Sequence, residues 1–135
     1  MSAMTSLDAE IIGALAQSEA VKTEFGDPVR IVEGETARAA FPFIRLARHE
    51  VRPETSPQPD LISHRISLEI FSRAGGRQEA GRLSALVEAA LRQADLTPEG
   101  HHLVLFHPVY SDIFLRADGT TFRGLLRLRA VTEAL

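Results

Sequence analysis

Residues 111–130, SDIFLRADGTTFRGLLRLRA, form the pattern that most constrains how this chain folds. Asp118–Gly119 is a hairpin signal between two strand-like runs. In the second run, residues 121–132, leucine and alanine alternate with arginine and valine from Leu126 to Val131. Successive side chains of a strand point to opposite faces of a sheet. The run therefore predicts a strand with its leucines in a core and with Arg127 and Arg129 on the opposite face.

Residues 61–73, LISHRISLEIFSR, alternate in the same way and predict a second strand. Its apolar positions are Ile62, Ile66, Leu68 and Ile70, and its polar positions are Ser63, Arg65, Ser67 and Glu69. The segment that follows, residues 77–93, carries one wide apolar stripe at helical spacing and predicts an amphipathic helix.

The other segments complete an element order of α-α-β-β-β-α-β-β. A first helix begins at the N-cap Ser6, and a short second helix runs from the cap Ser18 to Gly26. The remaining strands are expected at 29–32, 41–51 and 102–116. We predict an α+β fold with a largely antiparallel or mixed β-sheet, helices packed on one face and the other face open and charged.

The open face supplies most of the candidate interface residues. They are Arg45, Arg65, Glu69, Arg127 and Arg129 on the face, Pro57 and Pro59 in the loop 52–60, and Asp118 and Gly119 at the hairpin tip. Arginine is enriched at protein interfaces because its planar group stacks and pairs at once. The alternatives are the wall of a channel and a solvated face on which Glu69 pairs with an arginine of a neighbouring strand. The acidic total charge and the lack of exposed aromatics between the arginines argue against a dedicated nucleic-acid binder.

Composition sets limits on the function. The 135 residues carry a net charge of −3 and no cysteine, which excludes disulfides, thiolate nucleophiles and cysteine-based metal sites. The length predicts a single domain spanning residues 1–135. We expect no secretory signal at the N-terminus, and no apolar run approaches the roughly 20 residues needed to cross a bilayer.

Histidines are the main candidates for catalysis or metal binding in a chain without cysteine. No H-E-x-x-H motif occurs, and His64 falls in the apolar register of its strand, which predicts a core or edge histidine with a hydrogen-bonded ring. His102, His107 and Asp112 are able to meet only across a bulge. We therefore predict no catalytic residue, no metal site and no cofactor, and we keep a small hydrolase using these three residues as the least favoured alternative.

Three segments, in their order along the chain, resemble the proteins of a known family. The segments FPFIRL, SHRISLEIFSRAGGRQEA and LTPEGHHLVLFHPVYSDIFLRADGTTFRGLLRLRAVTE are similar to the tail-completion or tail-terminator proteins of long-tailed bacteriophages and of gene transfer agents. The resemblance spans most of the chain. Its most specific parts are the strand-to-helix junction S-R-x-x-G-R-x-E and the end D-G-T-T-x-x-G-x-L-R-x-R-A-x-T-E.

The resemblance implies a structural role in a phage-like particle. Such proteins form a ring, usually of six copies, at the head-proximal end of the tail tube. The ring stops tube polymerisation and docks onto the head-side connector, while DNA passes through its hole without sequence-specific binding. The implied partners are further copies of the chain, the tube protein and the connector or stopper. Assembly is expected in the bacterial cytoplasm, without a membrane. A head-side stopper or adaptor of similar size is the alternative within the same class.

Overall fold

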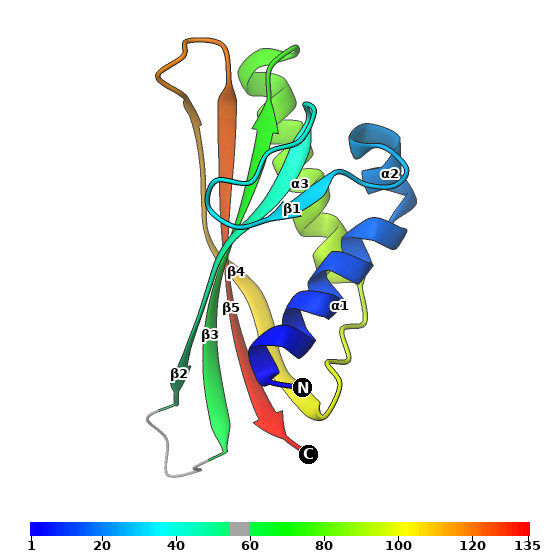
Figure 1. Ribbon diagram of the computed structural model, residues 1–135, viewed down its shortest axis with the longest axis vertical. Helices are drawn as coiled ribbons and strands as arrows, with labels where there is room; N and C mark the ends of the chain where they lie inside the picture. Colours follow the sequence, from blue (N-terminus) through cyan, green and yellow to red (C-terminus); the bar gives the residue numbers. More distant parts are fainter. Residues whose placement is uncertain (55–59) are drawn as a thin grey trace.

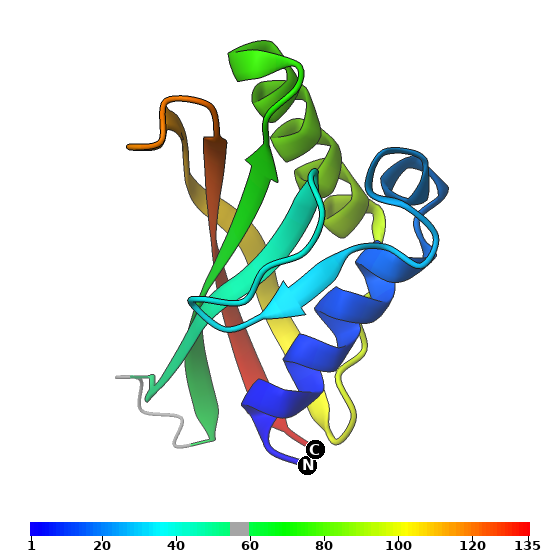
Figure 2. The same ribbon diagram turned by 45° about the horizontal axis from the view of Figure 1, so that its top comes forward.

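The computed structural model describes residues 1–54 and 60–135, which form three helices and a five-stranded sheet (Figures 1 and 2). The helices are α1 (Ala3–Gln17), α2 (Glu19–Phe25) and α3 (Gly76–Gln93). The strands are β1 (Ile31–Glu33), β2 (Phe43–Pro53), β3 (Leu61–Ser72), β4 (His101–Leu115) and β5 (Phe122–Ala134). No helix in these residues is long and apolar enough to cross a membrane.

The sheet has the strand order β1-β2-β3-β5-β4, and all three helices lie on one side of it (Figures 1 and 2). Only β1 and β2 pair in parallel, while the other neighbours are antiparallel. The predicted α+β fold, the element order and the placement of the helices on one face are therefore confirmed.

The helix starts follow the capping residues, with one difference from the prediction. Ser18 accepts a hydrogen bond from the Val21 amide and caps α2 as expected. The first helix begins earlier than predicted, because Ser2 accepts from the Thr5 amide and caps it. Ser6 lies inside α1 and is buried, and its hydroxyl donates to the Glu99 carbonyl oxygen at 2.8 Å, so it ties α1 to the loop before β4.

The core lies between the helices and one face of the sheet. Leu7, Ile11 and Leu15 line one side of α1 and are fully buried, as the apolar spacing predicts. They belong to one apolar cluster with residues of α3 and alternate residues of β3 and β5. Each such side chain contributes about 1.5–3 kcal/mol to stability. Arg127 and Arg129 alternate with buried Leu126 and Leu128, so the predicted division of β5 into two faces is confirmed.

One glycine allows α3 to approach the sheet closely. A Cβ atom on Gly124 of β5 would collide with the Ser84 hydroxyl of α3. A Cβ atom on Gly81 of α3 would lie 3.4 Å from the Ile113 Cδ1 atom of β4, which is an ordinary van der Waals distance. The close approach therefore explains Gly124, while the glycine inside α3, which costs about 1 kcal/mol relative to alanine, has no structural explanation.

Strand β4 forms one edge of the sheet, and Pro108 lies beside an irregularity in it. The register of β4 against β5 shifts between Pro108 and Tyr110, as the proline predicted. This long edge strand also exposes large apolar side chains. They include Val104, Val109, Tyr110, Phe114 and Leu115.

Candidate functional site

The candidate site is the face of the sheet that the helices leave uncovered, called the open face below (Figure 2). The cross-strand pairs that carry its predicted residues are Arg45–Glu69, Arg65–Arg129 and Ser67–Arg127. Residues directly opposite each other in an antiparallel pair share a face. All six residues therefore lie on the open face, as predicted.

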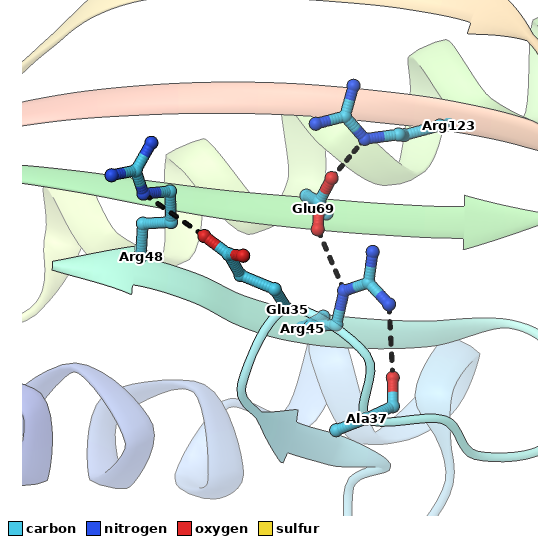
Figure 3. A network of polar contacts seen from close by, with 6 residues as sticks. All are labelled: Glu35, Ala37, Arg45, Arg48, Glu69 and Arg123. Carbon is cyan, nitrogen blue, oxygen red and sulfur yellow. Dashed lines mark hydrogen bonds and ion pairs between the residues drawn. The ribbon is translucent and has the colours of Figure 1, made fainter.

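One part of the open face holds a tight ionic network, the arginine–glutamate cluster of Arg45, Glu69 and Arg123 (Figure 3). Arg45 Nε donates to Glu69 Oε1 at 2.7 Å, and Arg123 Nε donates to Glu69 Oε2. Arg45 Nη1 also donates to the Ala37 carbonyl oxygen at 3.2 Å. One carboxylate thus uses both of its oxygens to bind two guanidinium groups from the flanking strands.

The arginine–glutamate cluster is buried, which corrects the expectation that this face is bare throughout. Only 8% of Arg45 and 3% of Glu69 is exposed. The covering comes from the segment 34–42 between β1 and β2, whose Ala37 contacts Arg45 and whose Glu35 binds Arg48 at 3.2 Å (Figure 3). Arg45 and Glu69 therefore stabilise this end of the sheet and present little surface to a partner.

A second group of arginines, the arginine trio, lies further along the open face and consists of Arg65, Arg127 and Arg129. Arg65 and Arg127 are exposed, and no carboxylate of the described residues lies within ion-pair distance of either. Arg129 is half-buried, and its Nη2 atom lies 3.4 Å from Glu54 Oε1. The arginine trio is the part of the predicted site that remains accessible.

Two aromatic residues of β4 belong to the site and were missed by the sequence reasoning. Tyr110 is 47% exposed and Phe114 is 40% exposed. The Arg127 guanidinium lies 5.3 Å from the centre of the Tyr110 ring, and the Arg123 guanidinium lies 5.0 Å from that of Phe114. The premise that no exposed aromatics interleave with the arginines is wrong. The i, i+2, i+4 spacing of Tyr110, Asp112 and Phe114 is the signal that places these side chains on one face.

The open face is hollowed into a groove of about 710 Å³, called the open-face groove. Its charged lining residues are Arg45, Arg48, Arg65, Arg123, Arg127, Arg129, Glu35, Glu50 and Glu69. Six arginines against three glutamates give the lining a net charge of +3. The whole chain carries −3, so positive charge is concentrated in this groove.

The hairpin tip is a compact turn. Asp118 accepts hydrogen bonds from the Thr121 hydroxyl and from the amides of Thr120 and Thr121. These bonds, the Thr121 hydroxyl first, hold the pKa of the Asp118 carboxyl well below its usual range. Gly119 has a φ of +76°, which glycine adopts without strain. Pro57 and Pro59, the other loop candidates, lie outside the described residues.

A chain of polar side chains crosses the interior on the helix-covered side. Asp8 Oδ1 of α1 lies 2.6 Å from His49 Nδ1, and His49 Nε2 lies 2.8 Å from His64 Nδ1. His64 Nε2 lies 2.8 Å from the Thr132 hydroxyl. The prediction of a core histidine with a hydrogen-bonded ring is confirmed for His64, which is fully buried.

Burial lowers the pKa of His64 from its ordinary value of 6.5 to about 4, with the neighbouring His49 as the next cause. His64 is therefore neutral at pH 7, and its two ring nitrogens are hydrogen-bonded to His49 and to the Thr132 hydroxyl. This polar chain joins α1, β2, β3 and β5 and acts as an internal tie of the fold.

The three residues of the hydrolase alternative do not converge. His102, His107 and Asp112 pair with Glu133, Arg129 and Leu125 of β5. These partners are four residues apart, which is about 13 Å along a strand. The three side chains therefore cannot act on one substrate atom. In the described residues, no group of three or more histidine, aspartate or glutamate side chains is arranged to hold a metal ion.

Comparison with protein families gives a match over almost the whole chain. Residues 9–133 match the family described as tail completion protein gp17. A search of curated proteins gives no significant match.

Two solved structures have the same fold. A chain in the virion of a native gene transfer agent (GTA) particle superposes with a TM-score of 0.83 at 19% identity, covering 99% of this chain and 100% of that one. The bacteriophage SPP1 gp17 protein superposes with a TM-score of 0.64 at 19% identity, covering 95% of this chain and 89% of that one. At this identity the likeness establishes the fold.

Proposed function

Because this chain belongs to the tail completion protein gp17 family, we propose that it forms a homohexameric ring on the head-proximal end of a tail tube. The ring ends polymerisation of the tube and joins the tube to the head-side connector. DNA passes through its central hole without sequence-specific contacts. Assembly takes place in the bacterial cytoplasm, and the protein stays at the junction of tail and head as a structural component of the particle.

The family match over residues 9–133 is the observation that carries this proposal. The shared fold with a chain of an assembled gene transfer agent particle supports it, because the superposition covers 99% of the chain. A ring also needs two different contact patches on each subunit. Each patch binds the other patch of the next copy, and the rotation from one copy to the next must close the ring. The open face and the helical side of the sheet are different surfaces of one subunit and meet this requirement (Figure 2).

Three surfaces serve as contacts in this proposal. Arg65, Arg127 and Arg129 of the open face bind acidic groups of a neighbouring subunit or of the tube. The hairpin between β4 and β5 lies at one end of the molecule (Figure 1). In the proposed ring, its tip, with Asp118 and Gly119, reaches along the axis of the tail. The loop 52–60, with Pro57 and Pro59, has limited conformational freedom to lose when it binds a partner.

Growth of tail tubes tests the function directly. Tube protein from the same particle is polymerised with and without the purified chain, and tube length is measured by electron microscopy. We expect shorter tubes that carry a ring at one end only. Unchanged tube lengths and bare ends at every concentration of the chain would contradict the proposal.

The partner that the chain captures separates the cap from a head-side stopper or adaptor. We expect the immobilised chain to retain the tube protein. The variant Arg127→Glu/Arg129→Glu should fold, because Arg127 is exposed and Arg129 is only half-buried, but should fail to join heads to tails. Retention of the portal-side protein alone would favour the head-side alternative.

A further inference from the structure

The two sides of the molecule carry opposite charge. The helical layer, defined as residues 1–28 and 76–100, contains nine carboxylate side chains and four basic ones, a net charge of −5. The open-face groove on the other side carries +3. All three helices lie on one side of the sheet, so the charges are separated across its thickness (Figures 1 and 2).

The arginine trio leaves positive charge uncompensated. Arg65 and Arg129 are directly opposite each other on β3 and β5, and like charges in this position destabilise a sheet. Arg127 projects from the same face two residues along β5. The segment 55–59 contains no carboxylate, so it cannot neutralise these groups. An anionic surface laid over the arginine trio would remove the repulsion.

The composition of the groove favours a protein surface over a nucleic acid. Glu35 and Glu50 line the groove among the arginines, so a partner that carries both acidic and basic side chains, as the helical layer does, can pair with both signs, which a phosphate backbone cannot. Tyr110 is exposed beside Arg127, and tyrosine with arginine is the composition typical of energetically important interface residues. Val109 adds a further exposed apolar side chain to the lining.

We propose that a second copy of this chain docks its acidic helical layer into the open-face groove. The contact is heterologous, because it joins the front of one subunit to the back of the next, and repetition with a fixed rotation closes a ring. This inference rests on the proposed ring function and adds to it the two surfaces that meet. The complementarity is built into one sequence, since the same chain supplies −5 on one side and +3 on the other.

Paired charge reversals test the proposal. The groove variant is Arg65→Glu/Arg127→Glu, and neither arginine has an ion-pair partner in the described part of the chain. The helical variant is Asp95→Lys/Glu99→Lys, which changes two exposed side chains of the loop between α3 and β4. A control, Arg38→Glu/Arg116→Glu, changes the net charge as the groove variant does, but at exposed residues outside both the groove lining and the helical layer.

Self-association is measured at low salt by sedimentation, and by the concentration dependence of amide NMR shifts up to the highest soluble concentration. We expect each reversed variant to associate at least about 100-fold more weakly than the wild type, because like charges then face each other across the contact. An equimolar mixture of the two variants should regain association, since each groove then meets a helical layer of opposite charge. The control should behave as the wild type does.

Three results would overturn the proposal. The first is a wild-type chain whose NMR shifts do not change with concentration. The second is a helical variant that associates normally while the groove variant does not, which would mean that another surface occupies the groove. The third is a wild type that binds a fluorescent DNA duplex with a steep salt dependence that the groove variant loses. Circular dichroism of each variant confirms that it is folded.

The tube-growth experiment separates this inference from the proposed function. If the wild type caps tubes but the mixture of variants fails to associate, the docking surfaces are wrong and the function stands. If the mixture associates and the wild type leaves tubes uncapped, the chain forms head-to-tail assemblies with another purpose.

Discussion

The open face carries two groups of arginines that differ in burial and in ion-pair partners. In the arginine–glutamate cluster, Arg45 and Arg123 share the carboxylate of Glu69 beneath the segment 34–42. In the arginine trio, Arg65 lies opposite another arginine and has no ion-pair partner in the described residues. The first group has used its charge inside the subunit, and the second has charge left for a partner.

The arginines of such a sheet face are therefore of two kinds. Arginines that face a buried carboxylate are part of the fold, and their loss is expected to unfold the protein. Arginines that face each other cost stability and are candidates for binding.

Replacement of Glu69 should cause the largest loss of stability. Glu69→Ala leaves Arg45 and Arg123 without their counterion, and Arg45 is buried. Removal of one partner from a buried ion pair costs about 3–5 kcal/mol. Urea denaturation measures the free energy of unfolding. The matched control is Glu50→Ala, because the Glu50–Arg48 pair is exposed and such pairs contribute about 0–1 kcal/mol. Equal losses in the two variants would break the distinction between the cluster and the rest of the face.

On the helix-covered face of the sheet, the polar chain of Asp8, His49, His64 and Thr132 makes the stability of the protein depend on pH. The folded-state pKa of His64 is about 4, below its ordinary value of 6.5. Between these values the unfolded chain binds more protons than the folded one, so the free energy of unfolding falls as pH falls through this window. The loss approaches about 3 kcal/mol near pH 4, and it is absent above pH 6.5.

Urea denaturation at several pH values measures this loss. The variant His64→Gln should be less stable at pH 7 but should show a shallower dependence on pH between 4 and 6.5. An identical pH dependence in the variant and the wild type would mean that other groups cause the acid sensitivity.

Local patterns were sufficient to predict the elements and the two faces of the sheet. The alternation in residues 61–73 and 121–132 has a period of two, and the stripe in residues 77–93 has a helical period, so each element is legible without knowledge of its neighbours. The cap of α1 was misplaced because Ser2 and Ser6 are both acceptable N-caps, and the choice depends on the contact of Ser6 with the loop before β4.

A glycine at the covered face should give an intermediate effect. Gly124→Ala places a methyl group against the Ser84 hydroxyl, and overpacking of this kind costs about 1–3 kcal/mol. The Ser84 hydroxyl is buried without a hydrogen-bond partner among the described residues, so Ser84→Ala alone should be neutral or stabilising. The double variant should recover part of the loss, and a thermal-denaturation cycle measures the coupling. Strictly additive effects would show that the contact does not limit the approach of α3.

The sequence alone could not predict which arginines of the open face are buried in ion pairs and which are accessible, because this depends on contacts between distant segments. The segment 34–42 supplies Ala37 and Glu35, whose position over the face carries no local signal. The aromatics of β4 were missed because two register shifts precede Tyr110, so the face on which the regular spacing of Tyr110 and Phe114 lies does not follow from the first half of the strand. A residue pattern gives the face of a side chain, while its partners follow from the register of neighbouring strands.

The smallest change in stability is expected at Arg65, and the test depends on whether stability rises or falls. Arg65→Thr removes one of two like charges that lie opposite each other, so stability should stay constant or rise by about 0.2–1 kcal/mol. Arg129→Thr alone should also relieve this repulsion, and the double variant should gain little more, because the repulsion is already gone after either change. The gain should shrink as salt is added, since the charges are exposed and screened.

Arg45→Thr is the matched variant from the arginine–glutamate cluster and should lose stability. A loss at Arg65 as large as that at Arg45 would mean that both groups of arginines serve the fold, and the arginine trio would then have no charge to spare for a neighbouring subunit.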